Sequence, residues 1–183
     1  MKRALLAAVL ILASSIAFAD ATSDLLDGEK VRSMSAEEYA AAVRNAPDVN
    51  VRDKDGTTPL HVAVAYAAPV NIAILVIAGA RVDARDDDWR TPLHEAAVFG
   101  TPSSIAMLVS AVANVNARDK YGFTPLHLAA WKGTPDNIVA LLDAGASGSM
   151  KDGDGKTPFD LAGGNDKVKG TSAYRALNDA QYK

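Results

Sequence analysis

Histidine is the residue type whose spacing first suggests chemistry in this chain. There are three histidines, His61, His94 and His127, and they are equally spaced along the sequence. Imidazoles bind metal ions or act as general bases, and three that converge on one point could ligate zinc. Equal spacing instead predicts that each histidine occupies the same slot of a repeated unit. We therefore expect the three to be spread along the molecule and to serve its packing.

Two acidic segments suggest a cation site less strongly. Asp86–Asp88 is a run of three aspartates, but the first belongs to a series that recurs at the same interval as the histidines, so only Asp87 and Asp88 are extra. The series consists of Asp53, Asp86, Asp119 and Asp152. The segment DGDGK at 152–156 lacks the glycine at the sixth position and the glutamate at the twelfth position of a calcium loop. We therefore expect no metal site.

The motifs for phosphate binding and hydrolysis are incomplete. GKT at 155–157 ends like a phosphate-binding loop, but Met150 stands where the first glycine is required. GASGS at 145–149 ends in serine instead of the glycine of a nucleophile elbow. The chain has no cysteine, and its histidines are assigned to packing. No nucleophile–base–acid set remains, so we expect neither catalysis nor a cofactor.

The N-terminal residues have the pattern of a secretory signal. Lys2 and Arg3 form a basic head, the apolar run ALLAAVLILA follows, and AFA at 17–19 is a small-x-small cleavage site. This pattern predicts a signal peptide over 1–19 that is cut after Ala19. An uncleaved membrane anchor is the alternative, but the strongly apolar run is short for a span of about 20 residues.

The cysteine content and the net charge limit the compartments and the classes of partner that we expect. With no cysteine, the chain forms no disulfides and carries no lipid-modified N-terminal cysteine. The style of the signal is bacterial, so we expect a periplasmic protein, with secretion beyond the periplasm as the alternative. The formal net charge is −3, which gives no basic excess for nucleic acid. After signal cleavage we expect no membrane insertion.

The strongest signal is an internal repeat. TTPLHVAV begins at residue 57, RTPLHEAA at 90 and FTPLHLAA at 123, and a weaker copy, KTPFDLAG, begins at 156. The interval between successive copies is constant. Each copy is followed by a second apolar segment, such as NIAILVIAGA at 71–80. A fixed period of this size predicts a stack of similar supersecondary units.

Each copy predicts two short antiparallel helices. The threonine is suited to cap the first helix, and the proline is suited to its first position, where an N–H is not needed. These motif residues are Thr58, Pro59 and His61; Thr91, Pro92 and His94; and Thr124, Pro125 and His127. A glycine such as Gly79 or Gly145 then ends the second helix. Helices this short are not stable alone, so the units must stack.

These motifs resemble the ankyrin repeat. The T-P-L-H-x-A string, the G-x-T-P-L-H opening and the Gly-Ala close all occur at that family's spacing, over about residues 47–162. The resemblance implies an all-α repeat solenoid of about four units, with short β-turn fingers and terminal caps. It also implies that the histidine hydrogen-bonds locally and ties neighbouring units together.

The repeat sets the expected domain boundaries. We divide the chain into a signal peptide (1–19), a leader (20–34) and an ankyrin-repeat domain (35–183). Within the domain we expect an N-terminal capping half-repeat (35–52), three repeats (53–85, 86–118 and 119–151), and a degenerate repeat with a C-terminal cap (152–183). SAEE at 35–38 fits a capping box and predicts a helix through about Arg44, and GTSAYRALNDA at 170–180 predicts a final helix. The leader is either loose or an extra short helix.

Three departures from the family pattern have structural consequences. Trp89 takes the turn-glycine slot held by Gly56 and Gly122, and we expect a distorted or differently shaped turn there because a bulky residue disfavours positive φ. Val112 replaces the glycine that ends the second helix. In the last unit, FD at 159–160 replaces the Leu-His pair.

The resemblance also implies a binding surface. In ankyrin arrays the variable positions lie on the finger tips and on the groove side of the first helix. Matched residue by residue, the candidate partner-binding residues are Tyr66, Asp87, Asp88, Trp89, Arg90, Phe99, Lys120, Tyr121, Phe123, Trp131 and Lys132. Six of them are aromatic, out of ten aromatic residues that follow Ala19, and aromatics beside Arg and Lys are typical of binding hot spots. The alternative is that some of these rings only protect the solenoid surface.

These observations predict a non-catalytic periplasmic protein, monomeric by itself, that binds another exported protein through its groove and fingers. Small exported ankyrin proteins that it resembles often accompany an enzyme, which suggests an accessory or protective role, for example beside a periplasmic oxidative-stress enzyme such as catalase. The alternative is an inhibitor or immunity protein that blocks a periplasmic toxin or hydrolase. A scaffold that grips peptidoglycan, and an enzyme with a site outside these motifs, are weaker alternatives.

Overall fold

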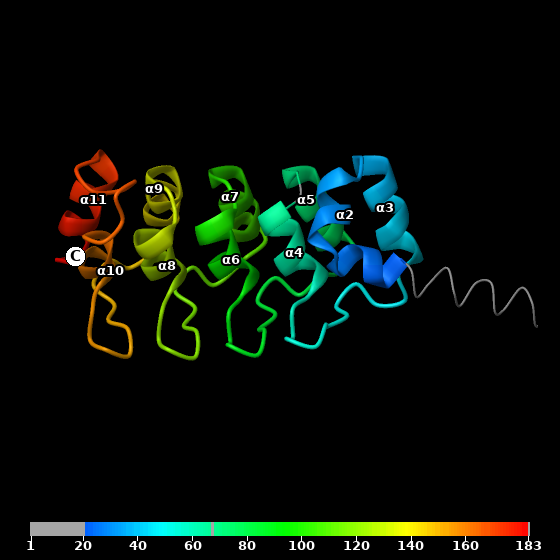
Figure 1. Ribbon diagram of the computed structural model, residues 1–183, viewed down its shortest axis with the longest axis horizontal. Helices are drawn as coiled ribbons and strands as arrows, with labels where there is room; N and C mark the ends of the chain where they lie inside the picture. The colour runs from blue at the N-terminus through cyan, green and yellow to red at the C-terminus, as the bar shows by residue number, and fades with distance from the viewer. Residues whose placement is uncertain (1–20, 67, 183) are drawn as a thin grey trace, which may run out of the picture.

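The chain is an array of stacked helix pairs, as predicted (Figure 1). The computed structural model describes residues 21–66 and 68–182, and the predicted signal peptide at 1–19 lies outside them. One layer contains α2 (Gly28–Ser33), α4 (Pro59–Tyr66), α6 (Pro92–Phe99), α8 (Pro125–Lys132) and α10 (Pro158–Ala162). The other contains α3 (Ala36–Asn45), α5 (Pro69–Ile77), α7 (Pro102–Ser110), α9 (Pro135–Asp143) and α11 (Ser172–Ala180). Each helix packs against its equivalents in the neighbouring pairs, and from α4 onward against its own pair partner. Loops between the pairs project to one side as a row of fingers (Figure 1).

Proline fixes where most of these helices begin. The first-layer helices α4, α6, α8 and α10 all start at the proline that follows the motif threonine. The second-layer helices α5, α7 and α9 also start at a proline. The hydroxyl of Thr101 accepts the N–H of Ser104 at 3.2 Å, which caps α7. Since proline has a fixed φ close to the helical value and no N–H to satisfy, it is suited to this position.

The motif leucines and alanines form the core between and within the layers. The fully buried first-layer residues include Leu60, Leu93 and Leu126, together with Ala63, Ala96 and Ala129. The second layer contributes Ile72 and Leu75, Ile105 and Leu108, and Ile138 and Leu141. Alanine on the first helices lets neighbouring helices approach closely, while the branched residues fill the space between layers. No unit encloses its own core, so stability comes from stacking on neighbours.

The turn at Trp89 is not distorted, contrary to our expectation. The N–H of Asp86 donates to the Arg90 oxygen at 2.9 Å, and the N–H of Trp89 donates to the Asp86 oxygen at 3.0 Å. The fingers that contain Gly56 and Gly122 make the same pair of bonds. Trp89 adopts a φ of 63°, in the left-handed region where those turn glycines lie. The surrounding hydrogen bonds determine the turn, and the tryptophan bears the backbone strain.

Val112 repeats this behaviour at the end of α7. Its φ is 69°, where Gly79 and Gly145 have 93° and 88° at the ends of α5 and α9. The N–H of Ala113 then donates to the Leu108 oxygen at 3.0 Å, which closes the helix end as in the neighbouring repeats. A β-branched residue in this region is a steric outlier. The valine therefore keeps the family's helix end at a cost in stability.

The array begins earlier than the half-repeat that we expected at residue 35. Within the predicted leader, α2 packs against α4 in the first layer, and its Val31 is buried. Before α2, residues 21–26 are helical and Leu25 is fully buried. The helical alternative for the leader is therefore the one found. With α2 in the first layer and α3 in the second, the first unit has both helices. Asp27, whose side chain caps α2, was the signal that the sequence analysis missed.

The helices predicted from capping signals are present at both ends. The Ser35 hydroxyl accepts the N–H of Glu38 at 3.2 Å, and the Glu38 carboxylate accepts the N–H of Ser35 at 2.8 Å, which forms the predicted capping box of α3. At the other end, the Thr171 hydroxyl accepts the N–H of Tyr174 at 3.2 Å and caps α11. Because α11 packs against α9 and α10, it covers the last unit of the stack.

Candidate protein-binding surface

The three histidines tie neighbouring units together. Each Nδ1 accepts the N–H of the motif threonine, and each Nε2 lies 3.1 Å from a backbone oxygen in the next finger. For His94 these partners are Thr91 and Phe123. A carbonyl oxygen can only accept, so Nε2 carries the proton and the ring is the neutral tautomer. Among the described residues, no group of three or more His, Cys, Asp or Glu side chains is arranged to hold a metal ion.

Burial keeps these imidazoles uncharged. It lowers the pKa of His94 to about 4, and it also lowers the pKa of His61 and of His127. In the last unit Asp160 takes the histidine slot, and its carboxylate accepts the N–H of Thr157 at 2.7 Å. An aspartate can complete this local cap, but it has no N–H that could donate to a backbone oxygen of a following finger, as the histidines do. α11 follows this unit instead of another finger, so the onward donor is not required.

The recurring finger aspartates close the turns. Oδ1 of Asp86 accepts the N–H of Asp88 and of Arg90, each at 2.9 Å. The same pair of bonds is made by Asp53, Asp119 and Asp152. The series is therefore structural, in agreement with the sequence analysis.

The two extra aspartates of the second finger pair with cations of the adjacent units. Asp87 lies 3.4 Å from a guanidinium nitrogen of Arg52, and Asp88 lies 3.8 Å from Nζ of Lys120. All four side chains are about half exposed or more. Such exposed pairs contribute little to stability, so Asp87, Asp88 and Lys120 are available to exchange these partners for groups on another protein.

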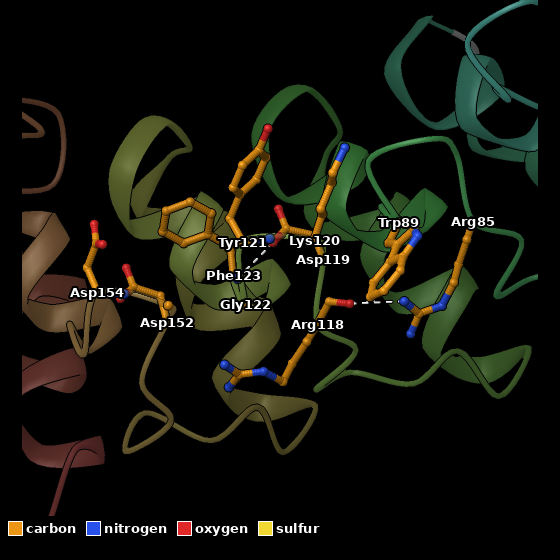
Figure 2. A pocket seen from close by; sticks show the side chains of 11 residues that line it. Arg85, Trp89, Arg118, Asp119, Lys120, Tyr121, Gly122, Phe123, Asp152 and Asp154 are labelled. Atoms are coloured by element: carbon orange, nitrogen blue, oxygen red, sulfur yellow. Dashed lines mark hydrogen bonds between the residues drawn. The ribbon is translucent and has the colours of Figure 1, made fainter.

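An open cavity of about 750 Å³ lies between the fingers. Trp89 comes from one finger and Tyr121 and Phe123 from the next, and Arg85 and Arg118 line the same cavity (Figure 2). The exposed fractions of Trp89 and Tyr121 are 56% and 54%. Sequence matching placed these aromatics on separate finger tips, and the structure brings them to one concave surface. Convergent aromatic and charged groups in a cavity are the usual composition of a binding site.

Arg85 and Arg118 also line the cavity, although they were not predicted from the sequence. Together with Arg52 they form a series in which Nη1 donates to a backbone oxygen of the next finger. The donor–acceptor distances are 2.6 Å for Arg52 to Arg85, 3.1 Å for Arg85 to Arg118 and 2.8 Å for Arg118 to Lys151. The available signal was the R-D pair, which recurs at the same interval as the histidines. These arginines fix the spacing of the fingers and so shape the cavity.

A second group of predicted residues lies where the third finger meets α8. The rings of Phe123 and Trp131 are stacked, with centroids 6.2 Å apart and planes at 27°. Nζ of Lys132 lies 3.9 Å from the Trp131 ring centroid, a cation–π contact. Trp131 remains exposed. Because these side chains already contact one another, binding of a partner here needs less further restriction of their rotamers.

Arg90 is engaged within the array. Its Nη1 lies 3.9 Å from Glu95 Oε1, and its Nε lies 3.7 Å from Oδ2 of the buried Asp119. The Arg90 oxygen also accepts from His61 of the preceding repeat. Of the predicted binding residues, Arg90 is therefore the one whose contacts are mostly structural.

Tyr66 and Phe99 lie apart from the cavity. Tyr66 lines a different hollow beside α2, and the Arg32 guanidinium carbon lies 5.4 Å from its ring centroid. Phe99 ends α6, is 64% exposed and has the position that Lys132 has on α8. The predicted aromatic residues thus fall into the finger cavity, the Phe123–Trp131 stack, and these two separate rings.

Comparison with protein families agrees with this architecture. A model described as ankyrin repeats in three copies matches residues 10–119, which is more than half of the chain. The chain belongs to the ankyrin-repeat family. A second ankyrin-repeat model, described as many copies, matches residues 108–162. Ankyrin repeats generally mediate protein–protein interaction and are typically non-catalytic. No curated protein matches the chain.

The ankyrin array also lacks a candidate membrane span in the part of the chain that the structure describes. No helix there is both long enough and apolar enough to cross a bilayer.

Proposed function

We propose that this ankyrin array is an exported, non-catalytic module that binds another exported protein through its fingers and the groove side of its first-layer helices. The observation that carries this proposal is the finger cavity, into which two successive repeats place Trp89 and Tyr121. Neither ring closes its turn. The slot of Trp89 holds Gly56 in the finger before it, and the slot of Tyr121 holds Asp88 in the finger of Trp89. The fold requires neither aromatic residue, and Trp89 adds backbone strain because its φ is positive. Both residues therefore support a role in recognition.

The surroundings of the two rings favour a protein partner. Arg85 and Arg118 line the cavity beside them, and Asp154 lies at its edge (Figure 2). Trp, Tyr and Arg are the residue types that dominate the binding energy of protein interfaces. Rings stacked as in the Phe123–Trp131 pair extend this surface toward the first helix of the third repeat.

The periplasm is the compartment that the sequence supports best. The basic head, apolar run and AFA site at 17–19 are those of a secretory signal. The chain has no cysteine, so it cannot form incorrect disulfides in an oxidising compartment. Within this compartment we propose an accessory or protective role toward a partner enzyme.

An inhibitor or immunity function is the second candidate, and the second finger favours it. Asp87 and Asp88 are exposed acidic residues at a finger tip beside Trp89. Such a tip would suit a basic target, for example a toxin active site that binds an anionic substrate. Loss of the target's activity on mixing with the purified array would favour inhibition, and unchanged or prolonged activity would favour the accessory role.

Affinity capture from periplasmic extract tests the proposed function. The bait is the array from Asp20 onward, compared with a Tyr121→Asp/Trp131→Asp variant, which changes the finger cavity and the Phe123–Trp131 stack, and with a Tyr182→Ser control. Tyr182 is an exposed aromatic residue outside the proposed surface. Circular dichroism first establishes that all three proteins are folded. We expect one protein to be retained by the bait and the control but not by the variant. Equal retention by all three would contradict the proposed surface.

A further inference from the structure

The outer face of two neighbouring second-layer helices, α5 and α7, is uncharged. No Asp, Glu, Lys or Arg occurs in 68–80, which contains α5, or in 101–114, which contains α7. The other second-layer helices all carry charge, such as Glu37 and Glu38 on α3 and Asp136 on α9. The charge-free surface is therefore limited to two neighbouring helices. It lies on the layer away from the fingers (Figure 1) and is independent of the proposed partner site.

This face has both a groove and ridges. A groove of about 360 Å³ runs between the two helices and is lined mainly by apolar groups, among them Ala73 and Val76 of α5 and Met107 of α7. Ile77 lies at the rim with 86% of its surface exposed. Single exposed apolar residues are ordinary, but a contiguous apolar patch of this kind marks an interaction surface.

Val112 follows α7 and is the chain neighbour of Ala111, which lines the groove. It is 84% exposed and holds a φ of 69° in a slot where α5 and α9 have glycine. A valine here loses stability through its backbone and exposes apolar surface to water, so the folded monomer gains nothing from it. Contact with another apolar surface would offset both costs.

We propose that this face, defined by α5, α7 and Val112, is the interface of a weak two-fold symmetric homodimer. A symmetric dimer brings the same patch of both copies together, so the patch must be complementary to itself. Here each copy supplies a groove and, in Ile77 and Val112, the ridges that would enter the groove of the other. Such a dimer differs from the monomer expected from the sequence.

Charge favours a second copy as the occupant. The chain is acidic, with a formal net charge of −3. Self-contact through α3 or α9 would bring acidic side chains such as Glu37 or Asp136 together, whereas the α5–α7 face avoids like-charge repulsion. A membrane surface is a poorer fit, because helices that lie on bilayers carry Lys and Arg on their polar side and α5 and α7 carry none.

The size of the face predicts that the dimer is weak. A helix of nine residues is roughly 14 Å long, and packed helices lie about 8–10 Å apart. Two such helices cover on the order of 300 Å², less than the roughly 800 Å² per partner of a stable complex. We therefore expect a dissociation constant between micromolar and millimolar concentrations.

Sedimentation velocity of the full chain over about 10 µM to 1 mM tests the proposal. The Ile77→Lys variant adds a charge at the rim of the groove, and Val139→Lys is the matched control on α9. We expect the wild type and Val139→Lys to shift toward a dimer as concentration rises, with little effect of salt, while Ile77→Lys stays monomeric. If Ile77→Lys does not fold by circular dichroism, Ala106→Glu on α7 takes its place.

Several results would overturn the proposal. One is a wild type that stays monomeric up to about 1 mM, and another is a dimer that survives Ile77→Lys or dissociates in high salt. A wild type that floats with phosphatidylcholine vesicles but does not dimerise would instead assign the face to a membrane surface.

Discussion

Nε2 of His94 lies 3.1 Å from the backbone oxygen of Phe123, and this hydrogen bond joins α6 of one repeat to the finger of the next. Nδ1 of the same ring accepts the N–H of Thr91 at 3.0 Å. One neutral imidazole thus caps its own helix and ties two repeats together. Protonation of Nδ1 would remove the acceptor and place a charge in a buried site, so the array depends on uncharged histidines.

The array is predicted to lose stability as the pH falls from about 6.5 to about 4. Burial lowers the pKa of His94 from 6.5 to about 4, so the unfolded chain binds this proton more readily than the folded chain. The contribution is fully present above the unfolded pKa and is lost as the pH falls toward the folded pKa, by roughly 3 kcal/mol for His94. His61 and His127 act in the same direction. Burial raises the pKa of Glu95, which opposes them. Urea unfolding at a series of pH values measures the slope.

His94→Gln is the matched control for that slope. Glutamine suits the third position of a capping box but does not titrate. The variant is expected to be about 1 kcal/mol less stable at neutral pH, because the bond to Phe123 is weakened or lost. Its stability should then change less steeply with pH than that of the wild type. An unchanged slope would show that His94 is not the group responsible.

Val112→Gly is predicted to stabilise the array by about 1 kcal/mol. Glycine adopts the observed φ of 69° without steric cost, and this gain exceeds the added flexibility of the unfolded chain. Thermal or chemical unfolding at low protein concentration, where association does not contribute, measures the change. The reciprocal variant Gly145→Val should destabilise by a similar amount, because a Cβ at Gly145 meets no other atom and only the backbone conformation is strained. Two changes of the same sign would contradict the assignment of strain.

Trp89→Gly is expected to separate stability from binding. Because Trp89 has a φ of 63° in a turn-glycine slot, the variant should be more stable by about 0.5–1 kcal/mol. It removes a ring from the finger cavity, so retention of the partner in the capture experiment should fall. Unfolding curves and capture are measured on the same preparations. A less stable variant with unchanged capture would assign Trp89 to the fold and not to the partner.

Arg90→Met is predicted to lower the free energy of unfolding by about 1–2 kcal/mol, because Oδ2 of the buried Asp119 loses its nearby cation. Because Arg90 is about one-third exposed, solvent screening limits this loss. Adding Asp119→Asn should recover part of the loss, since asparagine keeps the Oδ1 acceptor for the turn and removes the charge. A double-mutant cycle by urea unfolding checks this coupling. Strictly additive effects would show that the two side chains do not interact.

The helix starts that are marked by capping motifs could be predicted from the sequence. The Thr-Pro-x-His strings predicted where α4, α6 and α8 begin, and Ser35 with Glu38 predicted where α3 begins. The first-layer helix α2 was missed because its sequence, GEKVRS, has no Thr-Pro pair and contains a single buried residue, Val31. Only packing against α4 places it in the array.

The turn at Trp89 was wrongly predicted because intrinsic preference for φ was weighed without the hydrogen bonds that close the finger. Bonds within the turn and from the neighbouring fingers outweigh a strain on the order of 1–3 kcal/mol. For the site, sequence matching found the aromatic residues. It did not find Arg85 and Arg118, because their place beside Trp89 and Tyr121 follows from the stacking of fingers that lie one repeat apart in the sequence.

Site-specific photocross-linking in cells that export the chain tests the central claim most directly. A benzoylphenylalanine replaces Tyr121, which lines the finger cavity. In the control it replaces Tyr182, an exposed residue near the C-terminus and outside the proposed surface. Our account predicts an adduct with one other exported protein from position 121 and none from position 182, with loss of the adduct in the Trp89→Gly background. No adduct from position 121, or the same adduct from both positions, would contradict binding at the fingers.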